Sequence, residues 1–221
     1  MQMYVVKSSD VAKLVVKPKE ADEVSLKFGK IFEDCYTEAL YYYDKSYNTK
    51  SIPQKFIRKV AYRLKTEGIY SSELVRKAYR MYSCLLRAGV IGLKPRTEFR
   101  KFNDEILIAA QPDVYNIFTD QYFEFKTYPI DDYARMQCKV FSWVLRSPVI
   151  LIGLVDNNGY IDYQKEVIEC KELPVKRIPK ELGQLQEVCE KCWKPLRYCN
   201  CYSYNYPLRF EDLIDDDFKI W

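Results

Sequence analysis

Apolar residues in the N-terminal part of the chain recur at helical spacing. Residues 53–67 start on a proline, repeat Phe56, Val60 and Leu64 every four positions, and stop before a glycine. Residues 72–88 follow a serine, which is a favoured helix cap, and carry an apolar stripe at the same spacing. The pattern predicts two helices here and a mainly helical N-terminal region.

The periodicity changes after Gly92, where apolar and polar residues begin to alternate. The new pattern predicts three antiparallel strands, a helix capped by aspartate and a strand buried on both faces, over residues 97–102, 105–118, 121–128, 131–147 and 149–155. Together these elements predict an α/β fold whose core is a three-strand antiparallel meander, a helix and a parallel strand.

The chain contains no internal repeat and no low-complexity linker, so we expect one compact unit. Its segments are a helical N-terminal region over 1–92, the α/β core over 93–170, a cysteine-rich segment over 171–209 and an acidic tail over 210–221.

The amino-acid composition limits which classes of protein and of catalytic site are possible. Hydrophobic residues make up 48% of the chain, yet no apolar run approaches the roughly 20 residues that span a bilayer, so we expect a cytoplasmic protein. The net charge is +4, and because the tail is acidic the remainder is more basic, which suits a polyanionic partner. Histidine is absent, which excludes Ser-His-Asp hydrolases, Cys-His proteases and histidine-ligated zinc catalysis.

Two carboxylates and a lysine form the strongest candidate site. If the turn at residues 119–120 closes a hairpin with an even loop, Asp113 lies opposite Lys126, and Asp113, Glu124 and Lys126 project to one face. A three-residue loop would put Lys126 on the other face. Such a set can hold Mg²⁺ or Mn²⁺ between Asp113 and Glu124, with the backbone carbonyl of Phe125 as a third ligand, while Lys126 stabilises developing charge.

Pro112-Asp113 followed by Glu124-Phe125-Lys126 resembles the signature of the PD-(D/E)XK nucleases, which have a restriction-endonuclease-like core. In the next predicted helix, Gln137 and Phe141 resemble the Gln-x-x-x-Tyr motif of RecB-type nucleases, whose glutamine lies beside the active centre. The resemblance implies a metal-dependent DNA nuclease with Asp113, Glu124, Lys126 and Gln137 as its catalytic residues.

The upstream motif of RecB-type nucleases is matched less well. In that family a Gly-x-x-x-His-Glu helix supplies a metal-binding histidine, and the corresponding segment here is Gly68 to Glu73, with Ser72 in the histidine position. Either Glu73 serves as the ligand or that position is filled by water. The simpler interpretation is that Ser71 and Ser72 cap a helix.

Eight cysteines are present, at positions 35, 84, 138, 170, 189, 192, 199 and 201. The last four form a C-x2-C-x6-C-x-C cluster, which is typical of a tetrahedral zinc site or an iron–sulfur cluster. From the spacing alone zinc is the better choice, because all four ligands are local.

The cysteine layout is also similar to that of the iron–sulfur RecB-like nucleases, including the CRISPR-associated Cas-four family, in which one cysteine precedes the core and three follow it. That resemblance implies a 4Fe–4S cluster on Cys35, Cys189, Cys192 and Cys199, with Cys201 as the alternative to Cys199. On this basis we expect the iron–sulfur cluster and keep zinc as the alternative.

The resemblance further implies exonuclease activity on single-stranded DNA or DNA ends, and CRISPR integration or recombination proteins as partners in antiviral defence or repair. Candidate DNA contacts are Arg135, Lys139, Trp193 and Arg197, because cations can follow a phosphate backbone while rings stack on bases. The alternative is a non-catalytic DNA-binding or assembly module that keeps the fold and the cluster, which the missing histidine favours. An RNA-directed nuclease is a third possibility.

Overall fold

The protein is described by a computed structural model that covers residues 1–45 and 52–201. The helices are α1 Ser8–Lys13, α2 Glu23–Lys45, α3 Ile52–Thr66, α4 Ser72–Arg87 and α5 Asp132–Leu145. The strands are β1 Gln2–Lys7, β2 Glu98–Lys101, β3 Ile106–Ala110, β4 Val114–Asn116, β5 Gln121–Lys126, β6 Val149–Asn157, β7 Tyr160–Ile168 and β8 Gln184–Glu187. Short 3₁₀ turns, η2 and η3, lie at Lys180–Leu182 and Leu196–Tyr198. None of the helices in the described parts is long and apolar enough to cross a membrane.

The strands form two four-stranded mixed sheets, in the orders β2-β3-β1-β8 and β4-β5-β6-β7. In the first sheet β1 is parallel to β3, and in the second β5 is parallel to β6, while the other neighbouring strands are antiparallel. The fold is therefore mixed α/β, as the sequence predicted.

The expected three-strand meander is wrong. Residues 105–118 do not form one strand, because the chain leaves the ladder at Gln111 and Pro112, and proline has no N–H to continue it. The first half becomes β3, which pairs with β2 and β1, and the second half becomes β4, which pairs with β5 in the other sheet. The active-site aspartate predicted from the sequence thus lies where the chain passes between the two sheets.

Segments that lie far apart along the chain contribute neighbouring strands to the first sheet. From the N-terminal region, β1 lies between β3 of the expected core and β8 of the cysteine-rich segment. Val6 of β1 is fully buried, which explains why an apolar N-terminal strand serves as an interior strand. The acidic tail over 210–221 lies outside the described residues.

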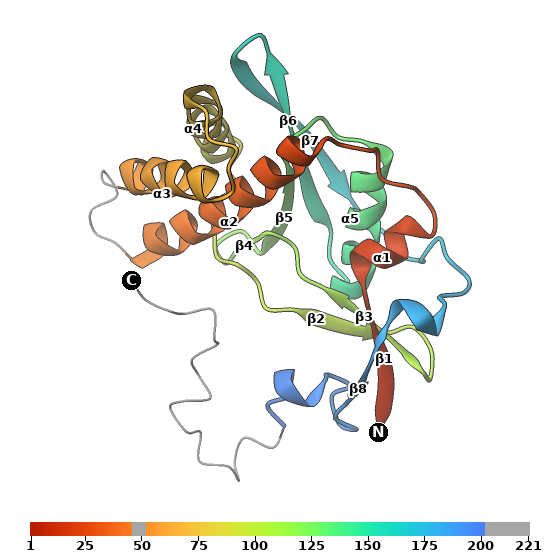
Figure 1. Cartoon of the computed structure of the whole chain (residues 1–221). Helices are drawn as coiled ribbons and strands as arrows, with labels where there is room; N and C mark the ends of the chain where they lie inside the picture. The colour runs from red at the N-terminus through yellow and green to blue at the C-terminus, as the bar shows by residue number, and fades with distance from the viewer. Residues whose placement is uncertain (46–51, 202–221) are drawn as a thin grey trace.

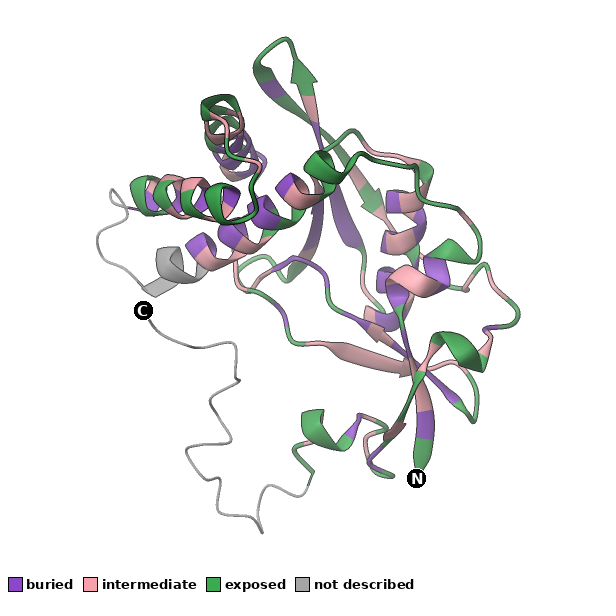
Figure 2. Ribbon diagram, viewed as in Figure 1, coloured by how far each residue is buried: buried purple, intermediate pink, exposed green. Residues whose placement is uncertain are grey.

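Two apolar layers cover the faces of the sheet β4-β5-β6-β7. Phe123 and Phe125 of β5 pack toward α2, α3 and α4, whereas Leu151 of β6 packs toward α5 and the first sheet. Figure 1 shows α2, α3 and α4 together on one side and α5 on the other. The buried positions follow these interfaces (Figure 2), so Glu124 and Lys126, which alternate with the phenylalanines, face the space between the two sheets.

Candidate active site and cysteine centre

The β4–β5 hairpin brings Asp113 and Glu124 together. Val114 pairs with Phe123 and Asn116 with Gln121, and the same register continued by one residue sets Asp113 opposite Glu124. The sequence predicted Asp113 opposite Lys126, so the register is two residues off. Because side chains alternate with period two, a shift of two keeps all three groups on one face.

Hydrogen bonds fix the geometry of this group. Oδ2 of Asp113 accepts a bond of 2.9 Å from the backbone N–H of Phe125, and the N–H of Asp113 donates to Oε2 of Glu124 at 3.3 Å. Nζ of Lys126 lies 2.6 Å from Oε1 of Glu124. Asp113 and Glu124 are 8% and 3% exposed, so the carboxylates are held in place in a largely dry setting.

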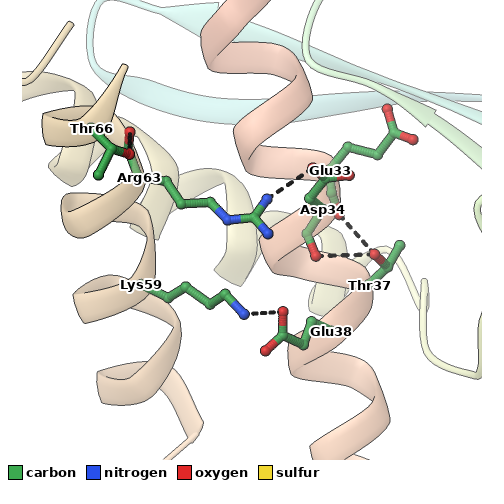
Figure 3. A network of polar contacts seen from close by, with 7 residues as sticks. All are labelled: Glu33, Asp34, Thr37, Glu38, Lys59, Arg63 and Thr66. Carbon is green, nitrogen blue, oxygen red and sulfur yellow. Dashed lines mark hydrogen bonds and ion pairs between the residues drawn. The ribbon is translucent and has the colours of Figure 1, made fainter. Parts of the chain in front are cut away.

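A third carboxylate, Glu33 of α2, joins this group, and our sequence analysis missed it. Its carboxyl lies beside that of Asp113, where desolvation and the Glu124 charge raise the pKa of Glu33, while the side chain as a whole is exposed at the cleft. On the opposite side of α2, Asp34 bonds Arg63 of α3 at 2.8 Å. Figure 3 shows Glu33 pointing away from α3. The sequence carried no signal for it, because Glu33 is one of several acidic residues in α2, Asp34 and Glu38 among them.

The carboxyl groups outnumber the cations in this group, which affects the pKa of each member. Burial raises the pKa of Asp113 well above its usual range, and the neighbouring Glu124 and Glu33 raise it further. Burial alone would lower the pKa of Lys126, but the Glu124 and Asp113 carboxylates raise it, so the lysine is held as a cation. One ammonium faces three carboxylates, and this excess of oxygen donors is chemically suited to a hard divalent cation.

A cleft of about 810 Å³ opens onto this group. Glu33 and Lys126 line its inner end, and Tyr128 and Tyr133 line its wall. The segment after β5 crosses closely over Gly153, where an added Cβ would lie 2.6 Å from the backbone nitrogen of Ile130. Glycine at this position therefore lets the cleft wall pack beside Lys126.

Other predicted residues do not line the cleft. Gln137 of α5 is half-buried and lines another groove together with Gln111. Glu73 is exposed in the first turn of α4 and does not line the cleft, and Ser71 caps that helix by accepting a bond from the Leu74 N–H.

The predicted DNA contacts on α5 differ in availability. Arg135 forms a two-pronged pair with Glu166, at 2.9 and 2.8 Å, and also bonds Asp132 at 3.0 Å. Lys139 is exposed. The Arg135 guanidinium is thus already bound within the protein. Phe125, whose backbone carbonyl was predicted as a metal ligand, lies on β5 where that strand pairs with β6, and its side chain is in the core.

The four C-terminal cysteines converge. The Sγ atoms of Cys189, Cys192, Cys199 and Cys201 all lie within 4.8 Å of one another, and the Cys192–Cys199 pair is 3.5 Å apart. Such a set could bind a metal. Cys35 is not among them, because it is buried in α2 within the apolar core. The structure therefore places Cys201, rather than Cys35, with the other three.

Backbone amides help to prepare this centre for a metal. Burial opposes ionisation of Cys189, but the N–H groups of Cys192 and Lys191 outweigh it and lower the pKa of the thiol to about 6. The Cys201 N–H lies 3.3 Å from Sγ of Cys199. Trp193 has a positive φ of 62°, a strained conformation for a bulky residue, and its N–H bonds the Cys189 carbonyl at 2.9 Å. The chain thus turns tightly around the first two sulfurs.

The cysteine centre docks on strand β2. Lys194 pairs with Glu98 at 2.9 Å, and the rings of Tyr198 and Phe99 are 5.2 Å apart. Nζ of Lys101 lies 4.4 Å from the centre of the Trp193 ring, which is therefore engaged within the protein. These contacts fix the position of the centre relative to the first sheet.

No protein-family model, no curated protein and no solved structure matches this chain.

Proposed function

We propose that this chain is a metal-dependent deoxyribonuclease with a restriction-endonuclease-like core, acting on single-stranded DNA or DNA ends. The observation that carries the proposal is the meeting of the buried Asp113 and Glu124 with Glu33 and Lys126, which line the cleft beside them. The set comes from α2 and from both strands of a hairpin, which is more than an isolated cross-strand ion pair would require.

The donor set suits Mg²⁺ or Mn²⁺. Asp113, Glu124 and Glu33 would hold the ion, which when bound supplies a Lewis acid and lowers the pKa of bound water. Two buried carboxylates, Asp113 and Glu124, and the cleft-lining Glu33 stand beside one lysine. When all are ionised they leave an excess of two negative charges, which a divalent cation would balance.

Lys126 would stabilise the negative charge that develops on a phosphodiester during hydrolysis. Its ammonium is held 2.6 Å from Oε1 of Glu124, so it is positioned before any substrate arrives. The Phe125 N–H holds Asp113 in the same way. These bonds pre-orient the groups, which is how an active site avoids reorganisation during the reaction.

For the cysteine centre we propose one zinc ion on Cys189, Cys192, Cys199 and Cys201, in place of the expected iron–sulfur cluster. With Zn–S bonds of about 2.3 Å, a tetrahedral site puts its sulfurs roughly 3.8 Å apart. The sulfurs here lie within 4.8 Å of one another. In a 4Fe–4S cluster each thiolate binds a different iron, so the thiolates stand further apart.

Cleavage of end-labelled single-stranded DNA, with Mn²⁺, Mg²⁺ or EDTA, tests the nuclease. We expect metal-dependent products from the wild type and from Glu67→Gln, an exposed carboxylate just beyond α3. Glu124→Gln keeps the shape of the side chain but removes its charge, and we expect it to abolish cleavage.

Two outcomes would redirect the proposal. If wild type and Glu124→Gln both bind DNA and neither cleaves it, the chain is a non-catalytic DNA-binding module. If labelled RNA is cleaved and DNA is not, the substrate assignment is wrong while the site stands. A role beside CRISPR integration or recombination proteins, implied by the Cas-four resemblance, depends on the nuclease result.

A further inference from the structure

A polar groove of about 460 Å³ lies between the first sheet and the cysteine centre. Four glutamine side chains give it its character, and we call it the amide groove: Gln111, Gln137, Gln184 and Gln186. Arg197 and Tyr198 of η3 border it from the cysteine centre. Amides can both donate and accept hydrogen bonds, so this lining is suited to a ligand with many polar edges.

The charge of the amide groove is positive. Its cations are Lys7 and Arg197, and neither forms an ion pair within residues 1–45 and 52–201. The groove's one carboxylate, Asp10, is already paired with Lys13 at 2.9 Å. The groove therefore favours an anion.

The two η3 residues are held in place from both ends. Arg197 and Tyr198 lie between Cys192 and Cys199, so closing the cysteine centre fixes the loop that carries them. The Tyr198 ring rests against Phe99, and the Arg197 guanidinium lies 4.9 Å from the centre of the Tyr198 ring. Tyr198 is still 41% exposed, so part of this pair is accessible from the surface.

The amide groove ends beside the carboxylate site. Gln111 precedes Asp113 by two residues, and its Nε2 donates a bond of 2.9 Å to the Pro95 carbonyl, which fixes this end. Glu33 and Lys126, which lie beside the same carboxylates, line the cleft. The groove and the cleft therefore each contain residues next to Asp113 and Glu124 in sequence or in space.

We propose that the amide groove binds a single strand of nucleic acid and leads it to Asp113 and Glu124, with Arg197 on the backbone phosphate and Tyr198 stacked on a base. This inference rests on the proposed nuclease function and names how its substrate is held. Amides and an exposed ring recognise base edges and base faces, which a duplex hides in its stack. The cysteine centre then serves as a substrate-positioning element.

Binding can be measured apart from cleavage. Fluorescence anisotropy of a labelled oligothymidylate with Glu124→Gln protein, in buffer without added Mg²⁺ or Mn²⁺, reports affinity without hydrolysis and leaves the cysteine centre intact. In that background we expect Arg197→Ala and Tyr198→Ala each to weaken binding about fivefold or more, since stacking of one base contributes on the order of 1–3 kcal/mol. Arg197→Ala should also reduce the slope of log affinity against log salt by about 0.7, the value for one phosphate contact on a single strand.

Matched controls are Arg58→Ala and Tyr62→Ala, which remove the same side chains from exposed positions of α3, outside the groove. We expect neither to change affinity, and both controls and Arg197→Ala to melt with the parent. Unchanged affinity in both Arg197→Ala and Tyr198→Ala, or equal losses of affinity in the two controls, would overturn the proposal that the amide groove binds nucleic acid. If the protein does not cleave DNA but its binding still depends on Arg197 and Tyr198, the nuclease proposal is wrong and the groove proposal stands. The two proposals can therefore fail separately.

Discussion

The carboxyl group of Glu33 lies beside that of Asp113 although 80 positions of the sequence separate them. Desolvation and the neighbouring carboxylate charges raise the pKa of both groups, so each takes up a proton at a higher pH than a free carboxyl would. Helix α2 is therefore part of the site as well as a cover over the sheet.

The first prediction separates the two glutamates that could complete the site. Replacing Glu33 by glutamine removes the charge of a cleft-lining carboxylate beside Asp113, so we expect metal-dependent cleavage to fall by about 100-fold, on the scale of losing a group that orients metal ligands. Glu73→Gln changes an exposed side chain outside the cleft and should leave the rate unchanged. Initial rates of DNA cleavage at several Mn²⁺ concentrations measure both. The opposite pattern would return Glu73 to the site.

The cysteine centre gives a prediction about the metal content of the protein. Purified protein should contain one zinc per chain by elemental analysis and no broad visible absorbance near 400 nm. Cys201→Ser removes one of the four converging thiols and should lower the zinc content, while Cys35→Ser changes a buried core residue and should not. Iron in the wild type that disappears in Cys35→Ser would instead support the cluster that the family resemblance implies.

The Arg135–Glu166 pair predicts a pH dependence of stability. The hydrogen bond from Arg135 lowers the pKa of Glu166 from its ordinary value of 4.5. A carboxyl whose pKa is lower in the folded than in the unfolded protein stabilises the fold at pH values above its unfolded pKa. This stabilisation is lost as the pH falls through its folded pKa. Glu166→Gln should therefore melt below the wild type at pH 7, with the gap closing below pH 4.5. Glu187→Gln, an exposed carboxylate on β8, provides the control, and a gap that stays constant with pH would contradict the assignment.

The aromatic core under the site predicts a large loss of stability. Phe32 is fully buried, and its ring packs edge-on against Phe56 and Phe125 at 5.9 and 6.1 Å between centroids. Truncation to alanine should lower the free energy of unfolding by about 3–5 kcal/mol, measured by urea denaturation. Leu26 lies on the same helix but is 62% exposed, so Leu26→Ala should cost much less. Similar losses in the two variants would mean that α2 does not pack as described.

Local patterns in the sequence predicted the elements that depend on short-range periodicity. The helices expected at 53–67 and 72–88 are confirmed as α3 and α4, and the helix and buried strand after residue 131 are confirmed as α5 and β6. Strand β6 is parallel to β5, as expected. The apolar spacing was sufficient in each case, because one face or both faces of the element are buried.

The pairing of strands could not be read from the sequence. Residues 105–118 alternate like one strand, yet β3 pairs with the N-terminal strand β1 and β4 with β5. The choice depends on which distant segment offers an apolar edge, and loop closure sets no strong preference among distant partners. For the same reason Glu33 was missed: nothing near it in sequence marks its approach to Asp113.

The sequence by itself determined that Glu124 and Lys126 share a face and that four cysteines lie within thirteen positions, because alternation and spacing are local properties. That Asp113 shares this face depended on an even hairpin loop, which the register of β4 and β5 shows. Only the tertiary structure decided that Glu33 reaches these carboxylates, that Cys201 rather than Cys35 completes the thiol group, and that η3 borders the groove beside Gln111. Each of these depends on long-range packing of helices and sheets, which follows from the burial of apolar surface across the whole chain.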